Sequence, residues 1–201
     1  MNKISLKDQQ LKLKEDIILS AVNQLLAQKG YDAMTVDSVA AQVGMAKPSL
    51  YKMFPSKESL AAAALIRLLD QALETASGQQ QDALPIDKLR AVLRWALELH
   101  LAGRMPLLPS TRSSLRDSLL NNPAYVERLQ LLSSVLLEWI EAAQRAGQID
   151  PDLPPAVVLY TLYARTCDPV LDFLRDSGEF DGERMIALVL GTCFDGLRCR
   201  A

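Results

Sequence analysis

The chain has 201 residues, of which 49% are apolar and 23% charged, and its mean hydropathy is close to zero. These values argue for a soluble globular protein of one or two domains that can bury a substantial core. The formal net charge of -2 is unevenly placed, since residues 1–57 carry +3 and the remainder carries -5. A basic head on an acidic body would show this asymmetry, and so would chance variation between two solvated surfaces.

No apolar run reaches the length of a membrane span, and the N-terminus lacks the apolar core of a signal sequence. We therefore expect a cytoplasmic protein without a membrane partner. The cysteines Cys167, Cys193 and Cys199 are odd in number and lie late in the chain, which indicates reduced thiols and not a disulfide framework.

The first predicted helix covers residues 7–29. One helical stripe of this segment carries Leu11, Ile18, Val22 and Leu25, and Gly30 is the expected C-terminal cap. This helix would brace the element that follows it.

Two short apolar stripes in residues 35–58 are separated by Gly44, which predicts a helix-turn-helix. The first stripe comprises Val36, Val39, Ala40 and Val43, and the second comprises Leu50 and Met53. Thr35 is a good N-cap, Gly44 can take the positive φ that ends the first helix, and Pro48 suits the start of the second. Short or basic side chains then remain on the outer face of the second helix, where they can enter a DNA major groove.

The remaining segments show helical periodicity without a convincing alternating strand, which predicts an all-α fold. Phe54-Pro55 breaks the chain, and Ser56 can cap a helix of about residues 57–77 that links head to body. Further helices are expected at about 86–102, 111–120, 123–146, 154–176 and 181–199, the first beginning near Pro85. Pro169 falls inside the segment 154–176 and should kink or split it.

The residues around the helix-turn-helix closely resemble the N-terminal domain of TetR-family transcriptional regulators, over about residues 10–65. The matching residues are Gly30-Tyr31, Thr35-Val36, Val39-Ala40, Gly44 to Tyr51 and Phe54 to Leu60. The chain departs from the family pattern at Ala46, where a capping Ser is common, and at Met53, where Tyr or His is common. The resemblance implies a helix-turn-helix DNA-binding domain at 1–57 and a larger helical effector-binding and dimerisation domain at 58–201.

Candidate DNA-binding residues fall into two groups, because charge gives affinity and contacts to base edges give sequence preference. We assign Thr35, Tyr51 and Lys57 to phosphates, and assign Lys47, Pro48 and Ser49 to base edges, which family members approach at these positions; Lys52 could serve either role. The alternative for Lys52 and Lys57 is surface solubility. The alternative for Tyr51 is packing on the core of the head, where Phe54 is the safer core residue.

The last two predicted helices are unusually apolar, and Ala187 and Gly191 would permit another helix to approach closely. The apolar residues are Leu159, Leu162, Leu171, Phe173, Leu174, Met185, Ile186, Val189, Leu190, Cys193, Phe194 and Leu197. The pattern fits a helix-pair dimer interface and a fully buried helix in a monomer equally well. The resemblance favours a homodimer through the last two helices.

Large and polar side chains on the central helices could line a ligand pocket. The candidates are Trp95, His100, Met105, Trp139, Tyr160, Tyr163 and Cys167, with Arg165 and Phe173 as further members. The alternative is ordinary core packing, and for His100 a hydrogen-bonded core position. Cys167, beside Asp168, could sense oxidants or electrophiles or could pack as a small apolar group.

We predict a sequence-specific DNA-binding regulator, a homodimeric repressor that holds double-stranded operator DNA and that a small molecule releases. The alternatives are an enzyme in the helical body and an interaction protein whose head no longer binds DNA. A single histidine, with no nucleophile–base spacing, phosphate loop or metal cluster, argues against the enzyme. No cofactor and no metal are expected.

Overall fold

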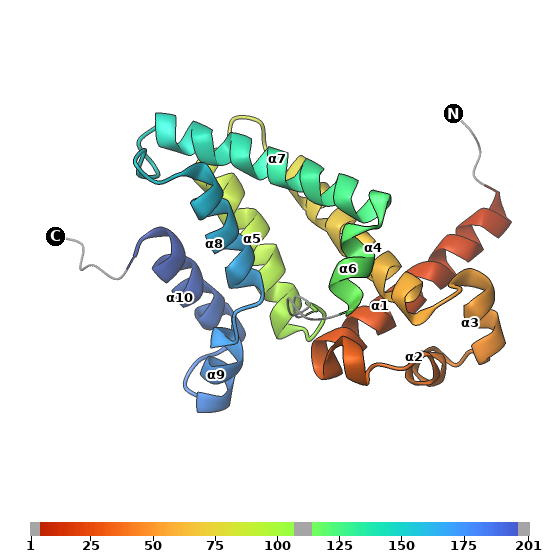
Figure 1. Ribbon diagram of the computed structural model, residues 1–201. Helices are drawn as coiled ribbons and strands as arrows, with labels where there is room; N and C mark the ends of the chain where they lie inside the picture. The colour runs from red at the N-terminus through yellow and green to blue at the C-terminus, as the bar shows by residue number, and fades with distance from the viewer. Residues whose placement is uncertain (1–4, 107–113, 197–201) are drawn as a thin grey trace. The chain divides into compact units, whose positions relative to one another are not determined.

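The protein is described by a computed structural model over residues 5–106 and 114–196, and every regular element in these ranges is an α-helix. In chain order the helices are α1 (Leu6–Ala33), α2 (Val36–Val43), α3 (Lys47–Met53), α4 (Lys57–Ser77), α5 (Pro85–Leu101), α6 (Ser114–Leu120), α7 (Pro123–Arg145), α8 (Pro155–Thr166), α9 (Val170–Ser177) and α10 (Gly182–Phe194). The all-α prediction is therefore confirmed (Figure 1).

The observed helix ends differ from the predicted ones mainly late in the chain. The predicted helix 154–176 is split into α8 and α9 at Pro169, as expected for a residue that cannot donate a backbone hydrogen bond. The prediction of a helix to residue 199 is wrong at its end, because α10 stops at Phe194 and Gly196 follows with a φ of 74°. The beginning of the predicted helix 111–120 lies outside the described residues.

The described residues form two compact units. The N-terminal unit contains α1, α2, α3, α4 up to Leu68, α6, and the start of α7 up to Val126. Its core consists of Ile18, Leu19, Val22, Leu25, Leu26, Met34, Val36, Val39, Ala40, Leu50, Phe54, Leu60, Ala61, Ala62, Ala64, Leu115 and Leu119. Helix α6 contributes Leu115 and Leu119 to this core, which is otherwise built from residues 18–64. No sequence pattern predicted this contribution of α6.

Helix α1 is only partly covered within its unit. Its buried residues begin at Ile18, whereas Leu11, on the same predicted stripe, is 55% exposed. The first turns extend beyond the helices that cover the rest of α1 (Figure 1). Gly30, with a φ of 73°, bends the backbone near the other end, and that conformation is easy only for glycine.

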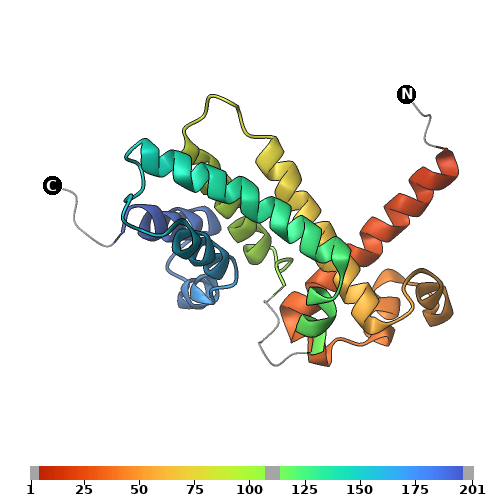
Figure 2. The same ribbon diagram turned by 45° about the horizontal axis from the view of Figure 1, so that its top comes forward.

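The C-terminal unit contains α4 from Leu69, α5, α7 from Glu127, and α8 to α10. Helix α5 has α8, α9 and α10 as neighbours, so it is the central element of this unit (Figure 2). The core consists of Ala72, Ala76, Leu89, Val92, Leu93, Leu97, Leu132, Leu136, Ile140, Leu159, Leu162, Leu171, Met185, Ile186, Val189 and Leu190. None of the described helices is both long enough and apolar enough to cross a bilayer.

Candidate nucleic-acid interface

The helix-turn-helix is formed by α2 and α3, and local hydrogen bonds fix its first helix at both ends. Thr35 is the N-cap, since its Oγ1 accepts from the backbone N–H of Ser38 at 3.1 Å and its own N–H donates to Ser38 Oγ at 3.2 Å. At the other end Gly44 adopts a φ of 66°, and the N–H of Met45 donates to the carbonyl of Ala40 at 2.9 Å. The predicted cap and turn are confirmed, and together they set the start of α3.

Helix α3 is anchored on one side only. Leu50 is 1% exposed and Phe54 is 7% exposed, so both belong to the core of the N-terminal unit. Ala46 precedes the helix without a side-chain cap, as its methyl group requires, and Pro48 lies in the first turn. The outer side of this seven-residue helix is left to polar and basic side chains.

Lys47, the first residue of α3, forms an ion pair with the first turn of α2. Its Nζ lies 2.8 Å from Oδ2 of Asp37, and both side chains remain substantially exposed. The hydrogen bond with Asp37 raises the pKa of Lys47 above its usual value, so the ammonium stays charged throughout the physiological range. No local sequence pattern indicated that Lys47 and Asp37 meet.

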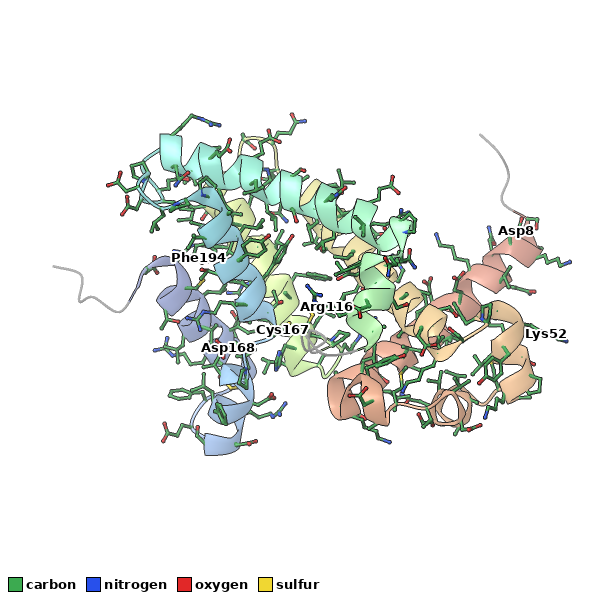
Figure 3. The ribbon with its side chains drawn as sticks, in the orientation of Figure 1. Asp8, Lys52, Arg116, Cys167, Asp168 and Phe194 are labelled. Carbon is green, nitrogen blue, oxygen red and sulfur yellow. The ribbon has the colours of Figure 1, made fainter. Side chains whose placement is uncertain are left out.

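Tyr51 and Lys52 lie on the exposed part of α3. Tyr51 is 43% exposed, so it is not a core residue of this unit, whereas Phe54 is. Lys52 makes no ion pair with the described part of the chain, and its side chain projects outward from α3 (Figure 3). Ser49 is half-buried and Pro48 exposed on the same helix. Their assignment to DNA contacts remains a prediction.

Lys57 and Glu58, at the start of α4, are held by the end of α1. Lys57 Nζ lies 4.3 Å from the centroid of the Tyr31 ring and donates to the carbonyl of Asp32 at 3.2 Å. The Tyr31 hydroxyl donates to Oε1 of Glu58 at 2.8 Å. Lys57 therefore has a structural role that the sequence did not reveal, and its assignment to phosphate remains a prediction.

Further polar contacts join α1 to α4 within the N-terminal unit. Arg67 Nε lies 3.1 Å from Oδ1 of Asp16, and the buried Asn23 donates from Nδ2 to the carbonyl of Ala64 at 3.3 Å. The start of α4 is capped by Ser56, whose Oγ accepts from the N–H of Ser59 at 3.0 Å, as predicted. This half of α4 is thus held along α1, the helix that also packs against α2.

The candidate ligand-binding residues lie in the C-terminal unit, and His100 and Tyr163 among them have polar partners there. His100 is buried, and its Nδ1 and Nε2 each lie 3.4 Å from a polar partner, the carbonyl of Thr166 and Oδ2 of Asp172 respectively. Tyr163 shares a 2.9 Å hydrogen bond with Ser133. The position of His100 is the hydrogen-bonded core position that was the alternative to a ligand contact.

The other candidates differ in how far they are exposed. Trp95 and Trp139 are half-buried against the core, Met105 is buried, and Tyr160 is 69% exposed. Cys167 is partly exposed and lies with Asp168 where α8 gives way to α9 (Figure 3). Whether these residues contact an effector remains a prediction.

The thiol of Cys193 lies partly buried in the C-terminal unit. Burial raises the pKa of the Cys193 thiol, and Arg165 and Arg90 offset that rise only in part. A raised pKa keeps this thiol protonated and poorly nucleophilic. No group of three or more His, Cys, Asp or Glu side chains that could hold a metal ion occurs in residues 5–106 and 114–196.

Comparison with known proteins identifies the helix-turn-helix segment. Residues 18–64 match the family described as bacterial regulatory proteins, tetR family. The HTH-type transcriptional regulator EthR of Mycolicibacterium smegmatis is 29% identical over 157 residues, an alignment that covers 74% of this chain and 68% of EthR.

Solved structures share the fold over nearly the whole chain. The fatty acid degradation regulator FadR from Bacillus halodurans superposes with a TM-score of 0.70 and 20% identity, covering 93% of this chain and 97% of FadR. AibR, solved in complex with isovaleryl coenzyme A and operator DNA, superposes with a TM-score of 0.59 and 20% identity, covering 90% and 98%.

The observed helix-turn-helix agrees with the matches to known proteins. The matched relatives are named as regulators, which argues against the alternative of an enzyme. The chain carries the DNA-binding domain of the tetR family of bacterial regulatory proteins and is a DNA-binding transcriptional regulator.

Proposed function

We propose that the protein is a homodimeric, cytoplasmic repressor that binds a near-palindromic operator and is released from it by a small molecule. The observation that carries this proposal is the one-sided anchoring of α3. Leu50 fixes the helix to the core, while Lys47 and Lys52 remain on exposed positions from which they can reach a major groove. Two such helices, about one DNA turn apart, would bind successive major grooves.

The exposed faces of α8 and α10 support the homodimer. Val157 is 54% exposed and Tyr160 is 69% exposed on α8, while Ala187 and Gly191 form a partly open strip on α10. Apart from the adjoining residues and the backbone of α10 itself, a Cβ built at Gly191 would have no heavy atom within 4 Å, so packing inside the described chain gives no reason for a glycine there. Glycine inside a helix is unfavourable by about 1 kcal/mol relative to alanine, and close approach of a second helix would offset that.

An acyl-coenzyme A is the first effector class to test, because AibR was solved with isovaleryl coenzyme A and operator DNA. We propose that the effector binds in the region 58–201 and favours a form in which the two DNA-binding heads are wrongly spaced, with α4 transmitting the change. The effector must bind the released form more tightly than the DNA-bound form, since a ligand shifts an equilibrium only by its difference in affinity.

The DNA-binding proposal is tested by selecting duplexes from a random pool with the full-length protein and measuring their affinity at physiological salt. We expect a near-palindromic selected sequence bound at least about 1,000-fold more tightly than a scrambled duplex. Selection without enrichment would contradict the proposal. Acyl-coenzyme A compounds of increasing chain length are then added to the complex, with Trp fluorescence and DNA release as the two readouts.

A further inference from the structure

An acidic side chain lies beside the first lysine of the recognition helix α3. Oδ2 of Asp37 is 2.8 Å from Nζ of Lys47. Asp37 is in the first turn of α2, whose backbone is fixed by the reciprocal hydrogen bonds between Thr35 and Ser38. The carboxylate that directs the Lys47 ammonium therefore stands on a well-held element.

This ion pair is poorly suited to stabilising the fold. The Lys47 side chain is 44% exposed and that of Asp37 is 68% exposed. Pairs this exposed contribute little to the stability of a fold, because water screens the charges and two side chains must be ordered. A carboxylate on a DNA-binding surface also repels phosphates and lowers the affinity for every sequence. A favourable effect of Asp37 on DNA recognition would therefore come from the way it positions Lys47.

The donor geometry of Lys47 gives Asp37 such a role. An ammonium group has three N–H donors, and Asp37 accepts from it at one of them. The remaining donors can bond acceptors on a base edge, such as O6 and N7 of guanine. Without Asp37 the long, flexible lysine side chain could turn to any nearby phosphate, a contact that carries no sequence information.

We infer that Asp37 is a positioning residue for sequence specificity, which holds Lys47 toward a base edge and away from phosphates at the expense of overall affinity. The inference rests on the proposed operator binding. Specificity is the difference between the affinities for the right and the wrong sequence. A residue that weakens binding to all DNA therefore raises specificity if it weakens binding to wrong sequences more.

The test is Asp37→Asn in the full-length protein, with the selected duplex and a scrambled duplex of equal length measured across a salt series. We expect affinity for the scrambled duplex to rise about tenfold and affinity for the selected duplex to rise less than about threefold. The logarithmic salt slope on scrambled DNA should steepen by about 1, because the released Lys47 gains a phosphate contact.

Two further variants decide whether Asp37 acts through Lys47. In a Lys47→Ala background, Asp37→Asn should change both affinities by the same factor, since the positioned group is gone. Asp32→Asn makes the same charge change at another exposed position of this unit and should also tighten both duplexes equally. The positioning role is overturned if Asp37→Asn in the otherwise unaltered protein gives the same ratio of selected-duplex to scrambled-duplex affinity as Asp32→Asn. Failure of the unaltered protein to discriminate would instead count against the proposed function.

Discussion

The hydroxyl of Tyr31, near the end of α1, donates a 2.8 Å hydrogen bond to Oε1 of Glu58 in the first turn of α4. The pKa of Glu58 is lowered from its ordinary value of 4.5 by the hydrogen bond from its own backbone N–H, then by Tyr31, then by Ser56. All three favour the ionised carboxylate in the folded state. We therefore expect the contact between α1 and α4 to weaken in acid.

Glu58→Gln should remove a stabilisation that depends on pH. Because the folded pKa is below the unfolded one, the carboxylate stabilises the fold fully above about pH 5 and loses this effect as pH falls through the folded value. The difference in unfolding free energy between the two proteins should be at most about 1 kcal/mol at pH 7, since solvent screens this partly exposed group. Urea unfolding between pH 3 and pH 7 measures it, and Tyr31→Phe should give an intermediate effect. A difference that stays constant over this range would contradict the expectation.

Lys47→Ala should weaken binding to the selected duplex by about 1–3 kcal/mol and bring its affinity closer to that of a scrambled one. Lys52→Ala, if Lys52 contacts a phosphate, should weaken both duplexes alike and reduce the salt slope by about 1. Band-shift titrations at three salt concentrations separate the two results. Lys88→Ala in the C-terminal unit is the control for charge, because Lys88 donates to the carbonyl of Gln81 outside the DNA-binding unit. An equal loss for Lys88→Ala would show that net charge alone is responsible.

The helix-turn-helix could be predicted because its signals are local. Thr35 caps a helix that starts one residue later, and Gly44 ends it in the left-handed conformation that glycine tolerates. Pro169 likewise splits a helix at its own position. Such effects depend on the few residues on either side and survive in any fold.

Contacts between distant segments could not be predicted in the same way. Leu115 and Leu119 join a core made by residues 18–64, and Lys57 lies on the ring of Tyr31. Helical periodicity shows that a face is apolar but not which helix covers it. Leu11 illustrates the point, because it continues the stripe of Ile18 and yet extends past the helices that bury the rest.

Asn23 should tolerate the loss of its amide better than the gain of a charge. It is 7% exposed, its Nδ2 donates to the carbonyl of Ala64, and its Oδ1 has no hydrogen-bond partner among the described residues. Asn23→Ala should cost about 1 kcal/mol of unfolding free energy, because the lost hydrogen bond is partly offset by removal of the unpaired oxygen. Asn23→Asp should cost about 3 kcal/mol or more at pH 7, since it leaves an unpaired carboxylate buried beside a carbonyl.

Chemical denaturation at pH 7 and pH 4 measures both Asn23 variants, and the penalty of Asn23→Asp should shrink at the lower pH as the carboxyl group takes up a proton. Gln24→Glu makes the same amide-to-acid change on the next residue, where the side chain bonds Gln42 at an exposed site, and should have a small effect. Equal penalties for Asn23→Asp and Gln24→Glu would mean that burial of Asn23 is not what sets the cost.

Substitution of Gly191 distinguishes a monomer from a dimer that packs through α10, because it should be favourable in the monomer and unfavourable in the dimer. If nothing approaches α10 at this position, Gly191→Ala should stabilise the protein by about 1 kcal/mol through helix propensity, because the added Cβ meets no atom of another element within 4 Å. If a second copy packs there, the same change should weaken association, and Gly191→Leu should abolish it while leaving the helical content of each chain intact. Sedimentation equilibrium over a concentration series, together with thermal unfolding, reports both quantities. Ser134→Leu places the same leucine side chain at an exposed position of α7 and should leave the association constant unchanged. We expect Gly191→Ala to weaken association and Gly191→Leu to abolish it. If both variants remain dimers and Gly191→Ala is stabilised, the dimer interface lies elsewhere.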